Sequence, residues 1–347
     1  MSAELIDIKS LTLGELENLI AELGDKRFRA GQIYQWLHQK LVEDFDEMTN
    51  ISKDLREKLK ASCRLVALRV ERLQVSKLDG TSKFLFELHD GNMIESVLMK
   101  YHHGNSVCIS SQVGCRMGCR FCASTLDGMV RNLTPSEMLD QIYRIQKISG
   151  ERVDNVVVMG SGEPFDNYDN LLRFVELLNH EKGLNISARN LTVSTCGLVP
   201  KIYELAQHKL QLTLAVSLHA PNDELRKTMM PIANKYSVKE IMEACRDYID
   251  KTGRRISFEY SLVKGVNDTK ECAMQLIGLV RGMNCHINLI PVNPIKERDY
   301  KQSEHKSIQD FKNTLEKNKI NCTRRREMGR DIDGACGQLR KAYLDKK

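Results

Sequence analysis

The chain has 347 residues, of which 41% are hydrophobic and 28% are charged. This length suits one large catalytic domain with a small appendage, or two domains. No stretch approaches the roughly 18 consecutive apolar residues of a membrane span. The first residues, MSAELIDIKS, include acidic side chains and lack the basic-then-apolar pattern of a signal peptide, so we expect a cytoplasmic protein. The formal net charge of +6 is too small to predict nucleic-acid binding by itself.

Residues 1–64 show the pattern of a helical unit. Thr12 and Glu15 form a capping box, and Gly24 is placed to end the helix that they begin. A second helix contains Trp36, and a third follows Ser52. The residues between the first two helices include the basic side chains Lys26, Arg27 and Arg29. The unit is either a simple helical cap or an accessory domain that recognises RNA.

Residues 65–106 change to strand patterns. Strands are predicted at 65–75, 83–88 and 93–101, separated by turns at Asp79-Gly80 and Asp90-Gly91. This pattern predicts a small antiparallel sheet that extends into the next region.

From residue 107 to residue 347, strands and helices alternate. The predicted strands are 107–110, 155–159, 190–194, 211–217, 255–261 and 285–290. The predicted helices are 134–148, 170–179, 238–252, 270–282 and 303–317. Repeated βα units indicate an α/β fold with a parallel sheet, either doubly wound or a partial barrel. In both, catalytic residues gather at the carboxyl ends of the strands.

Eleven cysteines are an odd number and a poor match to a closed disulfide framework. In a reducing compartment, grouped cysteines more often bind metal or take part in catalysis. Five cysteines stand singly in apolar or helical patterns and are predicted to be small core residues. These are Cys63, Cys245, Cys272, Cys285 and Cys322.

Three further cysteines, Cys115, Cys119 and Cys122, lie in GCRMGCRFC, just after the strand at 107–110. Three thiolates within eight residues can converge on one metal centre. A structural zinc site normally needs four ligands, whereas three thiolates on a four-iron cluster leave one iron open to bind a substrate. Zinc stays as the alternative. Its fourth ligand would be His102, His103 or Cys108.

The C-x3-C-x2-C spacing, with Phe121 before the last cysteine, resembles the radical S-adenosylmethionine (SAM) superfamily. The resemblance implies a partial (βα)6 barrel in which Cys115, Cys119 and Cys122 hold a 4Fe-4S cluster. It further implies that the open iron is chelated by the amino and carboxylate groups of SAM. An electron from the cluster then cleaves SAM into methionine and a 5′-deoxyadenosyl radical.

Polar residues at the strand ends indicate how SAM would be held. The loop from Gly160 to Pro164 contains glycines that let backbone approach a ligand and a carboxylate that can receive an ammonium. It resembles the G-x-G-E motif of the superfamily, with Ser161 where methionine is expected. Each polar strand end taken alone is more simply a turn or cap. By the resemblance, the SAM contacts are Gly162, Glu163, Ser194, Ser217, Leu218, His219 and Asn293.

Two more segments narrow the resemblance to the RlmN/Cfr family of rRNA adenine methyltransferases. They are DIDGACGQL at 331–339, with Gly334 where alanine is expected, and SVCISSQVGC at 106–115. The match spans nearly the whole chain. It implies that Cys336 carries the methyl group, that Cys108 is the resolving thiol and that Glu95 is the base. Without it, Cys336 could be a small packed residue and Glu95 an exposed acid on an alternating strand.

The chemistry explains why a methyl carrier is needed. Carbon 2 of adenine lies between two ring nitrogens and cannot attack the methyl group of SAM, but a thiolate can. By the resemblance, a radical formed on the methylated Cys336 adds to the ring and Glu95 removes the ring proton. Cys108 then attacks the sulfur of Cys336 and leaves a disulfide.

The implied substrates are an adenine of 23S rRNA near the peptidyl transferase centre and an adenine beside the anticodon of certain tRNAs. A flavodoxin or ferredoxin would donate the electron. The pairs Glu163-Pro164 and Gln112-Val113 favour RlmN-type methylation at carbon 2 over Cfr-type methylation at carbon 8. The basic run 324–326 could contact phosphates or be a solvated surface. A non-catalytic RNA-binding module with a structural metal is the rival from another class.

Overall fold

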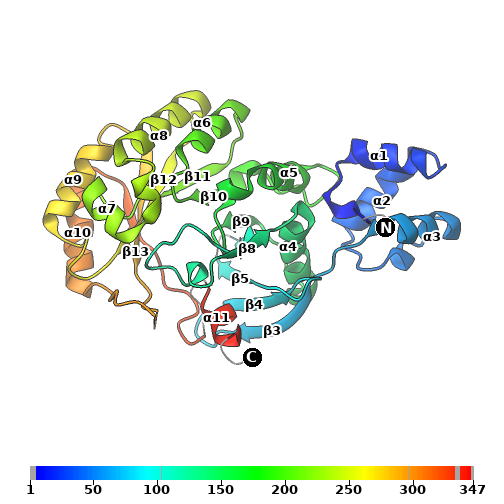
Figure 1. Ribbon diagram of the computed structural model, residues 1–347, viewed down its shortest axis with the longest axis horizontal. Coiled ribbons are helices and arrows are strands. Elements are labelled where there is room, and N and C mark those ends of the chain that lie inside the picture. Colours follow the sequence, from blue (N-terminus) through cyan, green and yellow to red (C-terminus); the bar gives the residue numbers. More distant parts are fainter. Residues whose placement is uncertain (1–4, 103, 296, 333–336, 345–347) are drawn as a thin grey trace.

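The structure of the protein is a computed structural model, and it describes residues 5–102, 104–295, 297–332 and 337–344 (Figure 1). Its centre is one ten-stranded sheet in the order β14-β13-β12-β11-β10-β9-β6-β5-β4-β3. The strands are β3 (Arg69–Val75), β4 (Ser82–Glu87), β5 (Met93–Tyr101), β6 (Gly104–Ile109), β9 (Asn155–Val158), β10 (Leu191–Thr195), β11 (Thr213–Ser217), β12 (Ile256–Leu262), β13 (Cys285–Pro291) and β14 (Cys322–Arg324).

Seven strands of this sheet, β6 and β9 to β14, run parallel. The edge strands β3 and β14 do not pair with each other in the described part of the chain. The sheet is therefore an open, partial barrel, which confirms the predicted α/β class. β14 was not predicted, and it supplies a seventh parallel strand.

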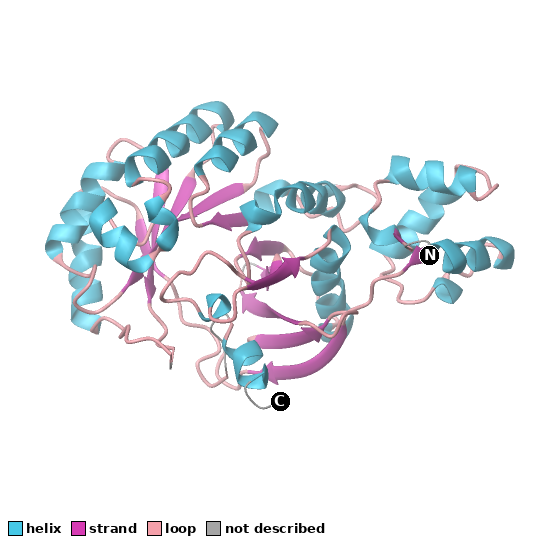
Figure 2. Cartoon of the chain, viewed as in Figure 1, coloured by secondary structure: helices cyan, strands magenta, loops and turns pink. Residues whose placement is uncertain are grey.

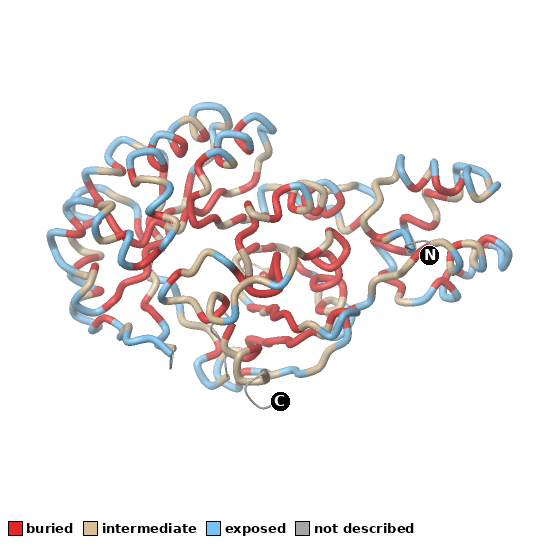
Figure 3. Tube along the Cα trace, viewed as in Figure 1, coloured by how far each residue is buried: buried red, intermediate tan, exposed pale blue. Residues whose placement is uncertain are grey.

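Helices connect the parallel strands and lie on the outer side of the curved sheet, as Figure 2 shows. They are α4 (Pro135–Ser149), α5 (Tyr168–Asn179), α6 (Val199–His208), α7 (Asp223–Met229), α8 (Val238–Thr252), α9 (Lys270–Val280) and α10 (His305–Lys317). α4 and α8 each begin with a capping box, and each ends at a glycine in the left-handed conformation. α6 and α7 were not predicted. The core cluster includes buried residues of the parallel strands and of the helices that cover them, and buried residues are red in Figure 3.

The predicted antiparallel strands form one edge of this same sheet. β5 pairs antiparallel with β6, and β4 and β3 follow outward. The two predicted turns are present, with Gly80 at φ 73° and Gly91 at φ 77°. The extension is therefore continuous with the barrel, and its strand β5 stands next to the first parallel strand.

The first residues form a separate helical unit, in blue at one end of Figure 1. Its helices are α1 (Leu13–Glu22), α2 (Arg29–His38) and α3 (Lys53–Ser62). The predicted capping box of Thr12 and Glu15 is present, and Gly24 has a φ of 78° just after α1. A parallel pair of two-residue strands, β1 (Ile6–Asp7) and β2 (Cys63–Arg64), joins the two ends of the unit. No helix in the described ranges is both long and apolar enough to cross a lipid bilayer.

A buried ion pair fixes this unit to α4. Lys9 Nζ lies 2.7 Å from Asp140 Oδ1, and both side chains are 1% exposed. The other oxygen of Asp140 accepts a hydrogen bond from the backbone N–H of Leu68 at 2.6 Å. His38 Nδ1 lies 2.7 Å from the hydroxyl of Tyr143 on the same helix. The helical unit is thus held at a defined place beside the barrel.

We predict that Lys9→Met lowers the free energy of unfolding by about 3 kcal/mol, because it leaves the Asp140 carboxylate buried without its cation. Urea unfolding followed by circular dichroism measures the change. Lys58→Met is the matched control, since Lys58 pairs with Asp54 on the surface of α3 and should leave stability near the wild-type value. Equal stabilities of the two variants would contradict the prediction.

Candidate active site

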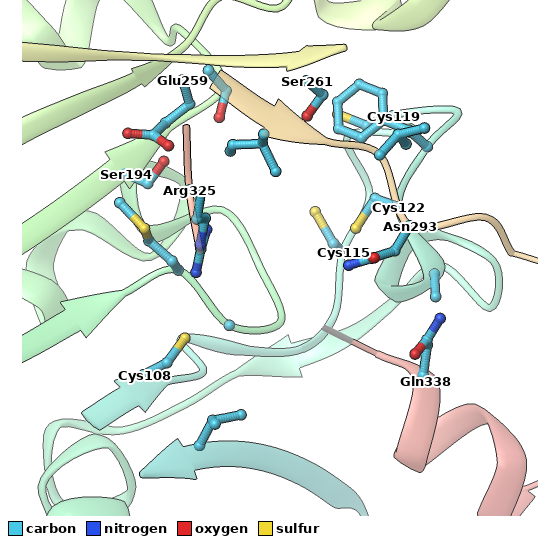
Figure 4. Close-up of a pocket in the computed structure, with 18 of the residues that line it drawn as sticks. Cys108, Cys115, Cys119, Cys122, Ser194, Glu259, Ser261, Asn293, Arg325 and Gln338 are labelled. Atoms are coloured by element: carbon cyan, nitrogen blue, oxygen red, sulfur yellow. The ribbon is translucent and has the colours of Figure 1, made fainter. Parts of the chain in front are cut away.

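A cavity of about 520 Å³ lies at the carboxyl ends of the parallel strands (Figure 4). Residues within or just after β6 and each of β9 to β14 line it, together with side chains of β5. Most of the predicted site residues meet there. They are Glu95, Cys108, Cys115, Cys119, Cys122, Gly162, Glu163, Ser194, Ser217, His219 and Asn293.

Two of the predicted site residues, Leu218 and Cys336, are not among the described residues that line the cavity. The Leu218 side chain does not line the cavity and is fully buried in the hydrophobic core. Cys336, the predicted methyl carrier, lies outside the described residues, as does the candidate zinc ligand His103. Gln338, two residues after Cys336, does line the cavity.

The cysteine triplet lies on the loop of a small hairpin formed by β7 (Gln112–Gly114) and β8 (Met129–Asn132). The loop is closed at its base by a hydrogen bond from Cys115 N–H to the carbonyl of Gly128 at 2.9 Å. Gly114 has a φ of 75°, and a Cβ there would lie 2.0 Å from that carbonyl oxygen. Only glycine permits this approach, so the start of the cysteine loop depends on Gly114.

The three thiols share one side of the cavity, and Cys108 lies across it (Figure 4). Cys115 and Cys119 are buried and Cys122 is half-buried. Burial raises the pKa of the Cys115 thiol to about 12 and also raises the pKa values of Cys119 and Cys122. Iron coordination would hold such thiols as thiolates. No group of three or more His, Cys, Asp or Glu side chains in the described ranges is placed to hold a single metal ion.

Glu163 is a buried carboxylate beside the triplet. One oxygen accepts from the N–H of Cys196 at 2.7 Å, and the other accepts from the N–H of Phe165 at 3.0 Å. Burial raises the pKa of Glu163, and these hydrogen bonds oppose that effect. Its own N–H donates to Gln112 Oε1 at 2.9 Å. The carboxylate is therefore oriented by backbone groups of two strand ends, and an ammonium in the cavity would be attracted to it.

The two glycines before Glu163 meet a steric requirement that was not predicted. A Cβ on Gly160 would lie 2.6 Å from the carbonyl oxygen of Ile109. A Cβ on Gly162, which has a φ of 106°, would lie 2.6 Å from Cβ of Gln112. The glycines therefore allow this loop to pack against the segment between β6 and β7. Gly162 still lines the cavity.

His219 connects the strand ends to the cysteine loop. Its Nδ1 accepts a hydrogen bond from the N–H of Ser261 at 2.9 Å, which leaves the ring proton on Nε2. Burial lowers its pKa to about 3, so the ring stays neutral. Its ring packs edge-on against Phe121 with centroids 4.6 Å apart. The aromatic residue of the cysteine motif thus rests on the end of β11.

Glu259 and Arg325 are charged residues of the cavity that were not among the predicted site residues. Glu259 is buried and accepts from Ser257 Oγ at 2.9 Å and from Asn288 Nδ2 at 2.7 Å. Arg325 follows β14, and Figure 4 shows its side chain between Cys108 and Glu259. Burial raises the pKa of the Cys108 thiol, and the Arg325 guanidinium opposes this. Part of the basic run therefore faces the interior of the barrel.

Two family models match the chain. The model of the "Ribosomal RNA large subunit methyltransferase N-terminal domain" matches residues 6–65, which is the helical unit. The model of the "Radical SAM superfamily" matches residues 109–277, which carry the cysteine loop and most of the parallel sheet. The fold and the site thus define a radical SAM enzyme.

Relatives that match the chain over nearly its full length identify the family within this class. The chain is 74% identical to "Probable dual-specificity RNA methyltransferase RlmN" of Lachnospira eligens, covering 98% of this chain and 97% of the relative. It is 63% identical to the protein of the same name from Lachnoclostridium phytofermentans, covering 99% and 96%. A crystal structure of a radical SAM methyltransferase from Sphaerobacter thermophilus superposes with a TM-score of 0.92 at 44% identity, covering 96% of this chain and 98% of that chain. The chain belongs to the RlmN family of RNA methyltransferases. It is a SAM-dependent enzyme of the radical SAM class, whose cofactors are a 4Fe-4S cluster and SAM.

We expect Cys115, Cys119 and Cys122 to be the ligands of that cluster. Replacing all three with alanine should abolish iron binding, because the described cavity would then lose the thiolates of its cysteine loop. Iron and acid-labile sulfide are measured after anaerobic reconstitution. Cys245→Ala, which changes a core cysteine of α8 away from the cavity, should retain both. A full complement of iron in the triple variant would rule out these ligands.

Proposed function

We propose that this enzyme methylates carbon 2 of adenine in 23S rRNA and in tRNA, through an S-methylcysteine formed on Cys336. One observation supports this proposal most directly. Cys108, the cysteine triplet and Gln338, which closely follows Cys336 in the chain, line one cavity. A structural metal site in an RNA-binding module would not need a further cysteine across the cavity from the triplet.

A methyl carrier is needed because carbon 2 of adenine cannot attack the methyl group of SAM as a nucleophile. The Cys336 thiolate takes a methyl group from one SAM by displacement and releases S-adenosylhomocysteine. When bound, the cluster and a second SAM supply a 5′-deoxyadenosyl radical, which takes one hydrogen atom from the S-methyl group. The carbon radical on Cys336 then forms a bond to carbon 2 of adenine.

Residues of the cavity complete the transfer. Glu95 accepts the proton from carbon 2, and one electron passes to the electron-carrier protein, which leaves a closed-shell thioether between RNA and Cys336. The Cys108 thiolate attacks the Cys336 sulfur, a disulfide forms, and the sulfur–carbon bond breaks. The electron pair of that bond stays with the methylene carbon, which takes a proton and becomes the methyl group. An external thiol reduces the disulfide.

The position of Arg325 supports the role of Cys108. A thiolate is the attacking form, and burial alone disfavours it. A guanidinium beside the thiol lowers the cost of forming the anion inside the cavity. Two partners complete the proposal. A flavodoxin or ferredoxin provides the electron, and both RNA substrates are met in the cytoplasm.

A contact in the site links the two residues that favour carbon 2. Gln112, whose side-chain Oε1 accepts the hydrogen bond from the N–H of Glu163, is fully buried. Its amide also donates to Asn132 at 2.8 Å and to Asp166 at 3.0 Å. The RlmN-type pairs Gln112-Val113 and Glu163-Pro164 are therefore parts of one hydrogen-bonded unit. Together with the RlmN relatives, this supports carbon 2 as the position methylated.

Product analysis tests the position of methylation. Reconstituted enzyme, SAM, a reductant and an RNA fragment should yield 2-methyladenosine, because the chain matches RlmN rather than Cfr at these pairs. Nucleosides are separated after digestion and compared with standards of both isomers. The same reaction without reductant is the control and should give no methylated nucleoside. If 8-methyladenosine is the main product, the Cfr-type activity holds instead.

The two proposed thiols should give different phenotypes on replacement. Cys336→Ala should bind the cluster and make no methylated RNA, because no carrier remains. Cys108→Ala should stall after the addition and be isolated with RNA attached through Cys336, because only an external thiol could then break the thioether. A denaturing gel with and without nuclease measures the attached RNA.

Cys285→Ala, a buried cysteine of β13 away from the cavity, is the control and should show neither effect. Two cysteines with merely structural roles would give similar, milder losses of activity. Retained methylation by Cys336→Ala, with no shifted band for Cys108→Ala, would exclude the carrier mechanism.

A further inference from the structure

The segment that follows Cys336 is docked at two places, on β5 and on the cysteine loop. It comprises Gly337 and α11 (Gln338–Leu344). The buried side chain of Leu339 packs with Leu85 of β4 and Met93 of β5. Arg340 is also buried, and its Nε donates to the carbonyl oxygen of Met93 at 3.0 Å. The segment is therefore packed against the antiparallel edge of the sheet.

One carboxylate, that of Glu95 on β5, accepts hydrogen bonds from two backbone N–H groups of this segment. Its Oε2 accepts a hydrogen bond from the N–H of Gly337 at 2.8 Å. Its Oε1 accepts one from the N–H of Arg340. Glu95 is 4% exposed, so these are charge-assisted hydrogen bonds in a site with little water. They hold the residue directly after Cys336.

Lys83 supplies the positive charge that compensates the buried carboxylate of Glu95. Lys83 Nζ lies 3.0 Å from Glu95 Oε2, and the Lys83 side chain is 0% exposed. In the register of β4 and β5, Leu85 stands opposite Glu95 and Lys83 opposite Val97, so the two charges are diagonal neighbours. Removing one partner of such a pair leaves an uncompensated buried charge. The orientation of Glu95 therefore depends on Lys83.

The second docking point of the segment is the contact of Gly337 with the cysteine loop. Gly337 has a φ of 80°, and a Cβ there would lie 2.9 Å from the backbone nitrogen of Ser124 and 3.0 Å from Cβ of Ala123. Ala123 and Ser124 directly follow Cys122, a predicted cluster ligand. The residue after the proposed methyl carrier thus touches the loop of the proposed cluster. The docked segment is held within reach of the place where the radical would form.

We propose that the Lys83–Glu95 ion pair is the anchor of the methyl-carrier segment, with Lys83 as a positioning residue for methyl transfer. This inference rests on the proposed function, because it takes Cys336 as the carrier. Lys83 acts through Glu95 and the backbone N–H groups of Gly337 and Arg340. A carboxylate has about four acceptor positions, and three of those of Glu95 are taken by these donors. One position is left for the ring proton, so anchoring and proton acceptance are compatible.

Hydrogen–deuterium exchange of the anaerobic holoenzyme tests the anchor directly. Lys83→Met should raise the exchange rate of peptide 337–344 by about tenfold, since hydrogen bonds to a charged group that is no longer held would weaken. Peptide 238–252 in α8 and the iron content should stay at wild-type values. Glu95→Gln, which removes the charge but keeps the shape, should raise the exchange of the same peptide 337–344.

Lys100→Met is the matched control, because Lys100 on β5 pairs with Glu151 at the surface and is remote from the segment. It should leave peptide 337–344 unchanged. Unchanged exchange of this peptide in both Lys83→Met and Glu95→Gln would overturn the proposal. So would a rise of equal size in peptide 238–252, because that result would reflect a general loss of stability.

A second readout separates this inference from the proposed function. Mass spectrometry of the wild-type protein after incubation with SAM reports the fraction of Cys336 that is methylated, and Lys83→Met should lower that fraction several-fold. If the wild-type protein carries no methyl group on Cys336, the proposed function fails, whereas the exchange experiment still decides whether the ion pair anchors the segment. A normal methylated fraction in Lys83→Met, with increased exchange, would overturn the positioning role of Lys83.

Discussion

The functional groups of this protein meet because seven parallel strands end at the same edge of one sheet. Residues far apart in the chain, such as Ser194, His219 and Asn293, line one cavity for this reason alone. The position of the cysteine loop also depends on this edge. The loop connects β7 to β8, and β7 directly follows β6 in the chain. Gly114 is the steric condition for that loop, because any side chain there would meet the carbonyl of Gly128.

The cavity is also defined by how its charges are paired. Three of the carboxylates that line it, those of Glu95, Glu163 and Glu259, are buried. A buried carboxylate is costly unless donors or a cation compensate it. Backbone N–H groups hold Glu163, amide and hydroxyl donors hold Glu259, and Lys83 holds Glu95. Each carboxylate therefore has a fixed orientation before any ligand enters. This is the preorganisation that a radical reaction in a closed site requires.

The same logic relates the two ends of the chain to the core. The helical unit is joined to α4 by the buried pair of Lys9 and Asp140. The carboxyl-terminal segment is joined to β5 by hydrogen bonds from two of its backbone N–H groups to Glu95, and the buried Lys83 of β4 pairs with that carboxylate. Lys9 and Asp140 are distant in sequence, whereas Lys83 and Glu95 stand on neighbouring strands. In both pairs the burial of a lysine is tolerable because a specific carboxylate pairs with it. These contacts favour one arrangement of the appendages over others.

Much of this could be predicted from sequence because the signals were local. The cysteine spacing, the capping boxes and the alternation of strands and helices each depend on a few neighbouring residues, and the structure has the corresponding loop, helices and sheet. β14 could not be recognised, because a three-residue strand next to three arginines has no hydrophobic period. The inward direction of Arg325 was hidden with it. α6 was missed because no side chain caps its start, although Pro200 stands in its first turn.

Glu95 shows a deeper limit of sequence reasoning. An acidic residue on a strand of alternating polarity is predicted to be exposed. Glu95 is instead buried and hydrogen-bonded to Gly337, which lies 242 residues further along the chain. Gly160 and Gly162 show a different limit, because the residue type was informative but one reason for it was hidden. They were expected to admit a ligand, and they also admit a neighbouring segment of the same chain. In both cases the missing information is which segments pack together, and no local pattern contains it.

An isotope experiment tests the central claim of a cysteine-borne methyl group most directly. The enzyme is loaded at Cys336 with a fully deuterated methyl group, freed of excess SAM, and supplied with unlabelled SAM, reductant and RNA in ordinary water. The account predicts a methylated adenosine whose methyl group has lost one deuterium and gained one hydrogen, together with 5′-deoxyadenosine that carries the lost deuterium. A product with a fully deuterated methyl group, or with no deuterium in the methyl group in a first turnover, would contradict it.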